Sequence, residues 1–431
     1  MLAIMAISIL ALFVIGAPIV VGLGMGTTIG IILDGAFPLE LIPQRMFTGL
    51  DSWPILAIPL FMLAGNLMDQ GGLSKKIVEC ASAWLGWVPG SLAMICVVTS
   101  MVFAGISGSS TADTAAVGSI LMPSMREKGY DMRFATVLQA GAGAIGPIIP
   151  PSILMVLIGY STGQSVGQLF LCGIIPGILV GISLMIYSFI HVARHPAEAG
   201  TAYGSRDKFV LSHALKCTWK ALPGLLLPFI IIFGIVGGAF TATEGASVAV
   251  LYGLIVALFV YKGITLKDLP QLLLKSAETA AMIIIITAGA YIFSWFITAK
   301  NVPNLLTEFM HANIHSQFAF LIFLNVALFI VGMFMESFTA IIVLMPILFP
   351  VATSFDIDPL VFGTIVCVNL AVGYVTPPYG ATLFVSCGLT GKSIREVLPF
   401  CFPVILAMVI ALLITTYFPE LYLWIPRMAA G

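Results

Sequence analysis

Long apolar runs separated by short polar connections make up most of this chain. A helix needs ~20 apolar residues to cross a bilayer, and runs of about that length or more cover residues 2–33, 53–70, 133–165, 168–193, 221–240, 243–261, 279–299, 359–389 and 396–424. Two further stretches, at about 90–125 and 316–352, each consist of two apolar arms around a tip of small polar residues. The pattern predicts an all-α polytopic membrane protein that contains two helical hairpins.

The composition agrees with a membrane location. Of the 431 residues, 60% are hydrophobic and 9% are charged, whereas soluble domains carry roughly 25% charged residues. The net charge of −1 and the lack of a basic patch give no indication of a nucleic-acid partner. The start of the chain shows neither a basic segment nor a convincing cleavage site, so we expect residues 2–33 to form one retained span. Scattered cysteines without a Cys-x-x-Cys pair indicate small buried residues.

The hairpins and the runs that follow them occur twice. Each hairpin is followed by an apolar run that is broken at a Pro-Pro pair. The second copy repeats the spacing of the first without a gap, so that Gly105 corresponds to Gly332, Gly146 to Gly373, and Pro150-Pro151 to Pro377-Pro378. Repeated units with broken helices are typical of secondary transporters, whose binding sites lie near the middle of the membrane at the breaks.

The distribution of positive charge predicts the orientation. The hairpin arms are short for a crossing, and irregular backbone at membrane depth must be buried in protein or face water, so we expect both hairpins to be re-entrant. Of the 18 Lys and Arg residues, all but Arg45, Lys300 and Arg427 then fall on one side, which the positive-inside bias assigns to the cytoplasm. This predicts an inverted repeat with a cytoplasmic N-terminus, a C-terminus outside, and hairpins that enter from opposite faces.

The repeat also predicts how the chain is divided. We expect a scaffold, a transport domain with the hairpins and broken helices, and amphipathic arm helices at the membrane interface that connect them. The scaffold is expected at 1–72, 221–261 and 279–299, the arms at 73–88 and 262–278, the transport domain at 89–193 and 300–426, and a cytoplasmic linker at 194–220. Such a division is typical of elevator-type transporters.

The prolines at each break predict a cation site. Proline has no N–H to bond the carbonyl four residues back, so the prolines should free the carbonyls of Gly143, Gly146 and Pro147 in the first copy and of Gly373 and Tyr374 in the second. Free carbonyls that face a tip rich in Gly and Ser can form an all-oxygen cage, and Na⁺ suits a cage without carboxylates better than a divalent ion.

The half-helices that begin after each break predict an anion site. Their N–H groups and positive dipole ends favour negative charge. No arginine lies at membrane depth, so a carboxylate substrate would depend on helix N-termini, hydroxyl groups or a partner protein. The candidate substrate contacts are Ser109, Ser110, Ser152, Ser337 and Thr382.

Several acidic and histidine residues also have structural interpretations. Ser110-Thr-Ala-Asp113 and Thr241-Ala-Thr-Glu244 have the capping-box pattern, and we prefer that interpretation for both acids, although Asp113 could still tune an ion site. Glu336 has no cap partner at the right spacing, so the sequence does not decide between a structural and a functional role for it. The histidine pairs 191/195 and 311/315 have a spacing that could hold a metal, but no third ligand is evident.

Two other classes of protein compete with a transporter. Gly105-Ile-Ser-Gly108 has the form found in intramembrane serine proteases, but such an enzyme needs a histidine at membrane depth, and the five histidines lie at span ends or in connections. A passive channel has no need of two inverted hairpins with paired broken helices. We therefore expect a secondary transporter rather than an enzyme or a channel.

Five motifs together resemble a known family. The stretches Leu56–Gly65, Gly105–Asp113, Ile145–Ser152, Phe240–Gly245 and Thr376–Gly380 are similar to those of the large membrane (M) subunit of tripartite ATP-independent periplasmic (TRAP) transporters. The resemblance runs nearly end to end. One departure is that Phe240-Thr-Ala-Thr-Glu-Gly245 lacks the Pro and Ala more usual in that motif.

The resemblance implies Na⁺-driven uptake of an organic acid across a bacterial inner membrane by an elevator mechanism. It implies two partners on separate chains, a small four-helix membrane subunit and a periplasmic substrate-binding protein. It also implies two Na⁺ sites. The first would involve Ala104, Gly105, Ser107, Gly146, Ile149 and Pro150, and the second Gly332, Gly373, Thr376 and Tyr379. The acid could be a C4-dicarboxylate, sialic acid or another sugar acid.

Overall fold

The computed structural model describes residues 1–88, 90–196 and 209–429, and those residues form helices without a strand. The predicted linker falls partly outside them. The first half contains α1 (Leu2–Val14), α2 (Ile19–Asp34), α3 (Leu41–Leu50), α4 (Trp53–Gln70), α5 (Leu73–Leu85), α6 (Ser91–Ser107), α7 (Ser110–Glu127), α8 (Met132–Gly143), α9 (Ile153–Thr162) and α10 (Val166–Arg194). The second contains α11 (Leu211–Val236), α12 (Ala242–Ile255), the π-helical turn η2 (Val256–Val260), α13 (Leu269–Ala299), α14 (Val302–Asn313), α15 (Gln317–Phe334), α16 (Ser337–Ser354), α17 (Pro359–Gly373), α18 (Ala381–Thr390), α19 (Ile394–Tyr417) and α20 (Glu420–Ala429).

The repeat that the prolines predict is present in the order of the helices. Helices α5 to α10 recur as α14 to α19, and α7 maps onto α16 from its first residue to its last. In each copy a hairpin (α6–α7 or α15–α16) is followed by a helix broken at its Pro-Pro pair (α8–α9 or α17–α18). Both Pro-Pro peptide bonds are cis.

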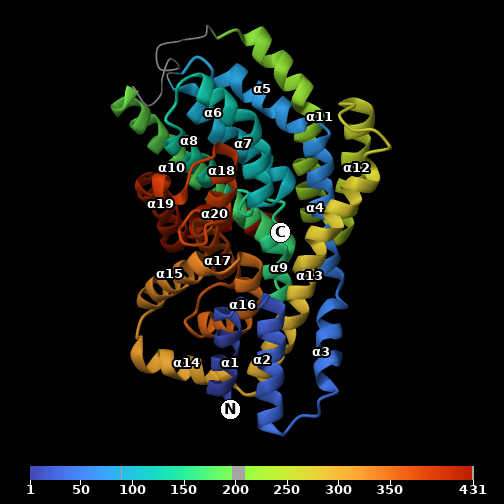
Figure 1. The fold of residues 1–431 in the computed structure, drawn as a ribbon, viewed down its shortest axis with the longest axis vertical. Coiled ribbons are helices and arrows are strands. Elements are labelled where there is room, and N and C mark those ends of the chain that lie inside the picture. Colours follow the sequence, from blue (N-terminus) through green and yellow to red (C-terminus); the bar gives the residue numbers. More distant parts are fainter. Residues whose placement is uncertain (89, 197–208, 430–431) are drawn as a thin grey trace.

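The two hairpins open toward opposite ends of the molecule (Figure 1). Helix α18 runs away from the tips to the open end of the first hairpin, where Arg126 Nη2 donates to the Thr390 carbonyl at 2.9 Å. Helix α9 runs the other way, because Ile158 near its end lies beside Gly363 at the start of α17. The two copies are therefore inverted, as predicted. We call the two ends the first-hairpin end and the second-hairpin end.

The helices form two groups. Helices α1–α4 and α11–α13, here called the frame, pack mainly on one another, and so do the hairpins, the broken helices, α10, α19 and α20, here called the core group. In Figure 1 the frame follows the right-hand and lower sides, while much of the core group lies to the upper left. Seven of the described helices are long and apolar enough to cross a membrane, or eight if the bent pair α3–α4 counts as one span.

The prediction that residues 2–33 form one span is wrong. The run breaks at Gly16-Ala17-Pro18 into α1 and α2, which lie antiparallel because Phe13 contacts Gly22 and Met5 contacts Gly30. Proline disfavours helical geometry in the residue before it, and Gly16 adopts a φ of 82°. The N-terminus therefore returns to the end where Asp34 pairs with Lys300 at 2.6 Å. The distribution of positive charge, applied to a single span over residues 2–33, predicts an N-terminus at the end opposite Lys300.

The second arm helix also differs from the prediction. Residues 269–278 are not a separate interfacial helix but the first turns of α13, which continues to Ala299. The counterpart of α5 is α14, which follows α13 as α5 follows α4. Helix α14 packs on α16 and α13, and it is drawn at the lower end of Figure 1, as is the N-terminus. The arm helices thus lie at opposite ends, as the inverted repeat requires.

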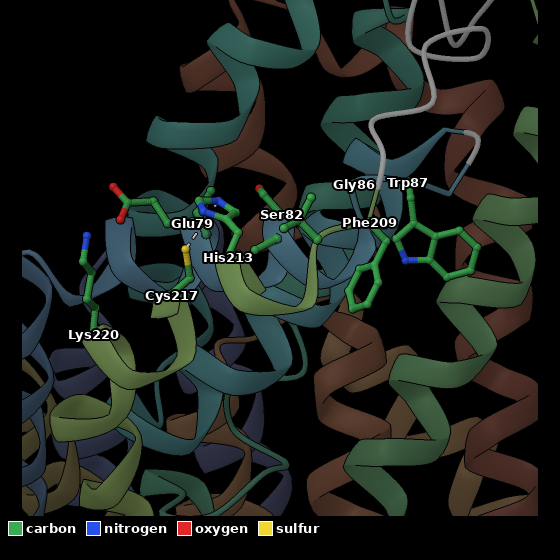
Figure 2. Close-up of a pocket in the computed structure, with 11 residues that line it drawn as sticks. Glu79, Ser82, Gly86, Trp87, Phe209, His213, Cys217 and Lys220 are labelled. Carbon is green, nitrogen blue, oxygen red and sulfur yellow. Dashed lines mark hydrogen bonds between the residues drawn. The ribbon is translucent and has the colours of Figure 1, made fainter. Parts of the chain in front are cut away.

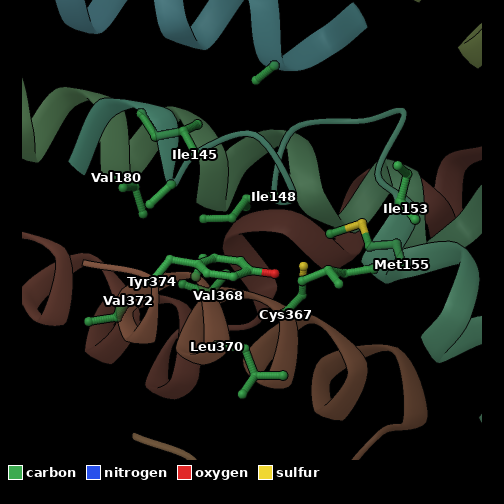
Figure 3. Packing of buried hydrophobic residues seen from close by; sticks show 14 of the residues in the cluster. Ile145, Ile148, Ile153, Met155, Val180, Cys367, Val368, Leu370, Val372 and Tyr374 are labelled. Atoms are coloured by element: carbon green, nitrogen blue, oxygen red, sulfur yellow. The ribbon is translucent and has the colours of Figure 1, made fainter. Parts of the chain in front are cut away.

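Apolar packing joins the two broken helices. Side chains of the first break, including Ile145 and Ile148, lie on the side of α17 that carries Val368 (Figure 3), whereas Leu370 points away from them toward Gly332. All of these side chains are buried. In the same layer Cys367 Sγ donates to the Pro147 carbonyl at 3.0 Å. The first break and α17 therefore share one packed interior at the centre of the core group.

Candidate functional site

The first tip touches the first break through its backbone. Helix α6 ends at Gly108, which has a φ of 61°. A Cβ atom at Gly108 would collide with the Pro151 carbonyl oxygen, and one at Gly105 would lie 3.5 Å from that of Pro150. Only glycine allows so close an approach at Gly108. Of the predicted residues, Gly105 thus lies beside Pro150, and Asp113 contacts both Ser107 and Gly146. Ala104 and Ile149 are chain neighbours of Gly105 and Pro150, and the side chain of Ile149 faces Gly177 of α10.

Asp113 is the acidic side chain at this contact. The capping box predicted for it is absent, since the N-cap of α7 is Ser109 and makes no side-chain cap bond. Instead Ser107 Oγ donates to Asp113 Oδ1, and Oδ2 is buried without a hydrogen-bond partner. Asp113 faces the break, because a Cβ at Gly146 would lie 2.6 Å from Oδ2. In contrast, the Thr241–Glu244 capping box is present as predicted.

Most of the carbonyls that the prolines release find new donors. In the first break, Gly143 accepts from the Gly146 amide at 3.0 Å, and Pro147 accepts from Ser152 Oγ and Cys367 Sγ. In the second, Gly373 accepts from the Thr376 amide at 3.0 Å and Tyr374 accepts from Thr382. Within the described residues only the Gly146 carbonyl of this set has no such donor. The prediction of free carbonyls is correct for Gly146 and wrong for the others, although each keeps a second lone pair.

The second tip and break are in contact as well. A Cβ at Gly373 would lie 2.7 Å from the Gly332 carbonyl oxygen. The Tyr379 amide donates to the Met333 carbonyl at 3.1 Å, which ties the break to the end of α15. Thr376 Oγ1 donates to the Val372 carbonyl at 2.9 Å. Gly332, Gly373, Thr376 and Tyr379, which the sequence assigned to a second Na⁺ site, therefore lie around one junction.

Glu336 is the residue that caps the second tip. It is itself the N-cap of α16, and its Oε2 accepts from the amides of Phe338 at 2.9 Å and Thr339 at 3.4 Å. Its Oε1 accepts from the Tyr374 hydroxyl at 3.2 Å. Both oxygens of Glu336 are thus used inside the protein. A carboxylate at a helix N-terminus is favourable, and at α16 the protein's own Glu336 takes that position.

Tyr374 links the two tips, which the sequence did not indicate. Besides Glu336, its hydroxyl interacts with the side chains of Ser337 from the second tip and Ser110 from the first. Figure 3 shows its ring beside Val368, with the hydroxyl directed into the space between the two copies. The only sequence signal was its position directly after Gly373.

The predicted substrate contacts are not equivalent. Ser152 caps α9 and donates to the Pro147 carbonyl. Thr382 Oγ1 donates to the Tyr374 carbonyl at 2.8 Å. Both hydroxyls therefore satisfy backbone carbonyls at the breaks. Ser110 and Ser337 are buried beside Tyr374. Ser109 is partly exposed and lines a cavity.

That cavity, of ≈ 240 Å³, lies between the first tip and the frame. The tip contributes Ser107, Ser109 and Thr111, and the frame contributes polar groups from α4 and α13. Those groups are Asn66, Asp69, Lys275 and Thr279. Asn66 Nδ2 donates to Ser276 Oγ at 2.8 Å, and Ser74 Oγ donates to Asp69. Among the described residues Lys275 has no ion pair within 4 Å, although it interacts with Asp69 at longer range.

A larger pocket, of ≈ 590 Å³, lies away from the tips where α5 meets α11 (Figure 2). His213 and Cys217 of α11 face Glu79 of α5 there, with 3.7 Å between His213 Nε2 and Cys217 Sγ. No group of three or more His, Cys, Asp or Glu residues in the described chain could hold a metal ion. His311 of the second predicted pair bonds Ser354 Oγ at 3.0 Å and stacks on Phe355.

Comparison with known proteins identifies the family. Residues 6–421 match the tripartite ATP-independent periplasmic transporter, DctM component. The chain is 37% identical over 407 residues to the C4-dicarboxylate TRAP transporter large permease protein DctM of Pseudomonas aeruginosa, with 94% of this chain and 93% of that protein covered. The chain belongs to the DctM family. Its members are named as permease components, so the chain is part of a TRAP transporter in a membrane and not a protease.

Other DctM-family relatives are named for different acids. The chain is 32% identical to the sialic acid TRAP transporter large permease protein SiaM of Vibrio cholerae, over 93% of this chain and 92% of that protein. It is 40% identical to the isethionate TRAP transporter permease protein DctMQ of Oleidesulfovibrio alaskensis, where the match covers 98% of this chain but 65% of the relative. These names place the DctM family among organic-acid transporters and leave the acid open.

A solved structure supports the fold. The YdaH transporter of Alcanivorax borkumensis superposes with a TM-score of 0.64 over 89% of this chain and 90% of that one, at 14% identity. At that identity the likeness concerns the fold alone.

Proposed function

We propose that this DctM-family chain carries an organic acid into the cell together with Na⁺. The observation that supports this best is the contact between tip and break in each repeat, with Gly105 and Gly108 against Pro150-Pro151 and Gly332 against Gly373. Each junction gathers backbone oxygens. Such oxygen-rich junctions suit a hard monovalent cation, and two junctions give two Na⁺ ions per cycle.

The substrate carboxylate would bind at the first tip. The N-terminus of α16 already holds the Glu336 carboxylate, whereas the N-cap of α7 has no side-chain cap. The open N–H groups of α7 favour an anion. They border the cavity that also contains Ser109, Thr111 and Lys275. The acid would therefore lie between the first tip and α13, close to the first Na⁺ junction.

We propose that the frame is the scaffold and that the core group moves as an elevator. The hairpins would be re-entrant and the first-hairpin end cytoplasmic, since most Lys and Arg residues lie there. With α1 and α2 forming a hairpin, the N-terminus then faces the periplasm, and the arm helices α5 and α14 span from scaffold to moving body. A rigid shift keeps both cation junctions closed, whereas opening them would expose backbone groups at several kcal/mol each.

Two partners complete the transporter. The family description is tripartite, and we propose that the other parts are a small membrane subunit against the frame and a periplasmic binding protein that delivers the acid. The frame offers an apolar surface, with Met25, Ile32, Leu251, Met282 and Ile285 exposed.

The test is uptake into proteoliposomes that contain all three components. We expect uptake of the cognate acid to require an inward Na⁺ gradient and to persist when a proton gradient is collapsed. Omission of either partner should reduce the rate to near background. Full uptake without Na⁺ on either side would contradict the coupling, and equal rates from this chain alone would contradict the tripartite assembly.

A further inference from the structure

Asp113 has a buried carboxylate, and only one of its two oxygens has a hydrogen-bond partner among the described residues. It is fully buried in the first turn of α7. Ser107 satisfies Oδ1, but Oδ2 has no hydrogen-bond partner. A buried carboxylate oxygen without a partner is costly, and buried charges are normally paired or bound to a metal ion. Oδ2 therefore requires either a proton or a bound cation, since no side chain of the described residues pairs with it.

No side chain around Asp113 provides that charge. None of the ion pairs among the described residues involves Asp113. The charged group that interacts with it is Asp69 of α4, which is also acidic. The space in front of Oδ2 belongs to the break, where Gly146 lacks a side chain and keeps its carbonyl without an internal donor. A bound cation would give Oδ2 a partner of the opposite charge, with the Gly146 carbonyl as a neighbouring oxygen ligand.

The second repeat has no such carboxylate. The position in that copy that corresponds to Asp113 is Ala340, which is buried. The nearby acid of that copy, Glu336, has both oxygens occupied by α16 amides and Tyr374. The two junctions therefore differ in whether a carboxylate oxygen is left without a partner, although their backbones match.

We propose that Asp113 Oδ2 is an anionic ligand of the first Na⁺ site, beside the backbone oxygens of the tip and break, and that the second site has no carboxylate ligand. This inference rests on the proposed Na⁺ coupling. With Na⁺ bound, the first site is electrically neutral and can move through the membrane at low cost.

Binding of ²²Na⁺ to the purified protein tests this inference without any transport step. The informative variant is Asp113→Asn, which keeps the shape and the bond to Ser107 but removes the charge. We expect the wild type to bind two ions and Asp113→Asn to bind one, or to bind the other at least tenfold more weakly. The matched control is Glu336→Gln, which should still bind two. Two ions bound to Asp113→Asn with unchanged affinity would overturn the assignment.

A second variant covers the case in which Asp113→Asn does not fold. Gly146→Ala keeps the charge but places a methyl group 2.6 Å from Oδ2, so it should displace the carboxylate and remove the same ion. Na⁺-dependent thermal stabilisation, which follows the number of ions bound, gives an independent measurement. Retention of both ions by Gly146→Ala would also contradict the proposal. If the wild type binds no Na⁺, the proposed coupling itself fails, and the assignment with it.

Discussion

Cys367 Sγ lies 3.0 Å from the Pro147 carbonyl oxygen, to which it donates, although the residues stand 220 positions apart. The same carbonyl accepts from Ser152, which caps α9. The break in the helix of the first repeat is thus hydrogen-bonded to α17, the first half of the broken helix in the second repeat. Because both partners are buried, the two junctions cannot separate without exposing polar groups, and they should move as one body.

The first prediction concerns that movement. Cysteines at Ser52 and Tyr160, whose side chains meet between frame and core group, should stop uptake when they are cross-linked, and a reductant should restore it. The control pair, Arg126 and Thr390, lies within the core group, and its cross-link should leave most of the activity. If the control cross-link blocked uptake and the first did not, local gating at the tips would be the better description.

The second prediction concerns the N-terminus. Single cysteines at Ala3, Glu127 and His315 lie at exposed positions. In intact cells an impermeant maleimide should label Ala3→Cys and His315→Cys but not Glu127→Cys, because the α1–α2 hairpin returns the N-terminus to the second-hairpin end. If residues 2–33 were one crossing, Ala3→Cys would stay unlabelled as Glu127→Cys does.

The third prediction concerns the link between the tips. Tyr374→Phe removes the hydroxyl that donates to Glu336 at 3.2 Å, so the unfolding free energy should fall by ~1–3 kcal/mol, the usual cost of leaving a buried partner unsatisfied. A lower melting temperature in detergent would show this. Tyr379→Phe is the control, since that ring is 40% exposed and its hydroxyl has no hydrogen bond among the described residues. Equal effects of the two changes would argue against a tip-to-tip role.

Helix-breaking residues made much of the fold predictable. Gly and Pro act on the backbone locally, so their matched spacing revealed the repeat, in which α7 maps onto α16 from end to end. The same logic could have found the break at Gly16-Ala17-Pro18, which the length of the apolar run concealed. Helix α14 was missed because its apolar face alternates with Glu308 and His311, so that it has no long apolar run.

The side chains at the junctions were less predictable. Asp113 and Glu336 both stand near helix N-termini, where a carboxylate can cap the helix or face elsewhere. Sequence spacing favoured a cap for Asp113 and none for Glu336, and the structure shows the reverse. The choice depends on Gly146 and Tyr374, which come from distant parts of the chain. Local spacing carries no information about such neighbours.

The last prediction concerns how the acid is recognised. The sequence placed Lys275 in the predicted interfacial arm 262–278, but it lies on α13 and lines the cavity that also contains Ser109 and Thr111. Lys275 is exposed, but it borders the cavity, so a carboxylate bound there would lie at short range, where the Coulomb attraction is strongest. Asp69 on the same wall balances Lys275 when no substrate is present.

Lys275→Gln should therefore raise the KM for the acid about tenfold, or ~1.4 kcal/mol, with little change in kcat, because the Na⁺ junctions are left intact. Lys267→Gln removes an equal charge at the same end of the molecule but outside the cavity, so it controls for long-range attraction of the anion. Rising salt should reduce any effect of Lys267 but preserve most of that of Lys275. Equal KM values for the two variants at physiological salt would show that Lys275 acts only through long-range attraction of the anion. Binding of the carboxylate would then depend on the N-terminus of α7 and its hydroxyl groups alone.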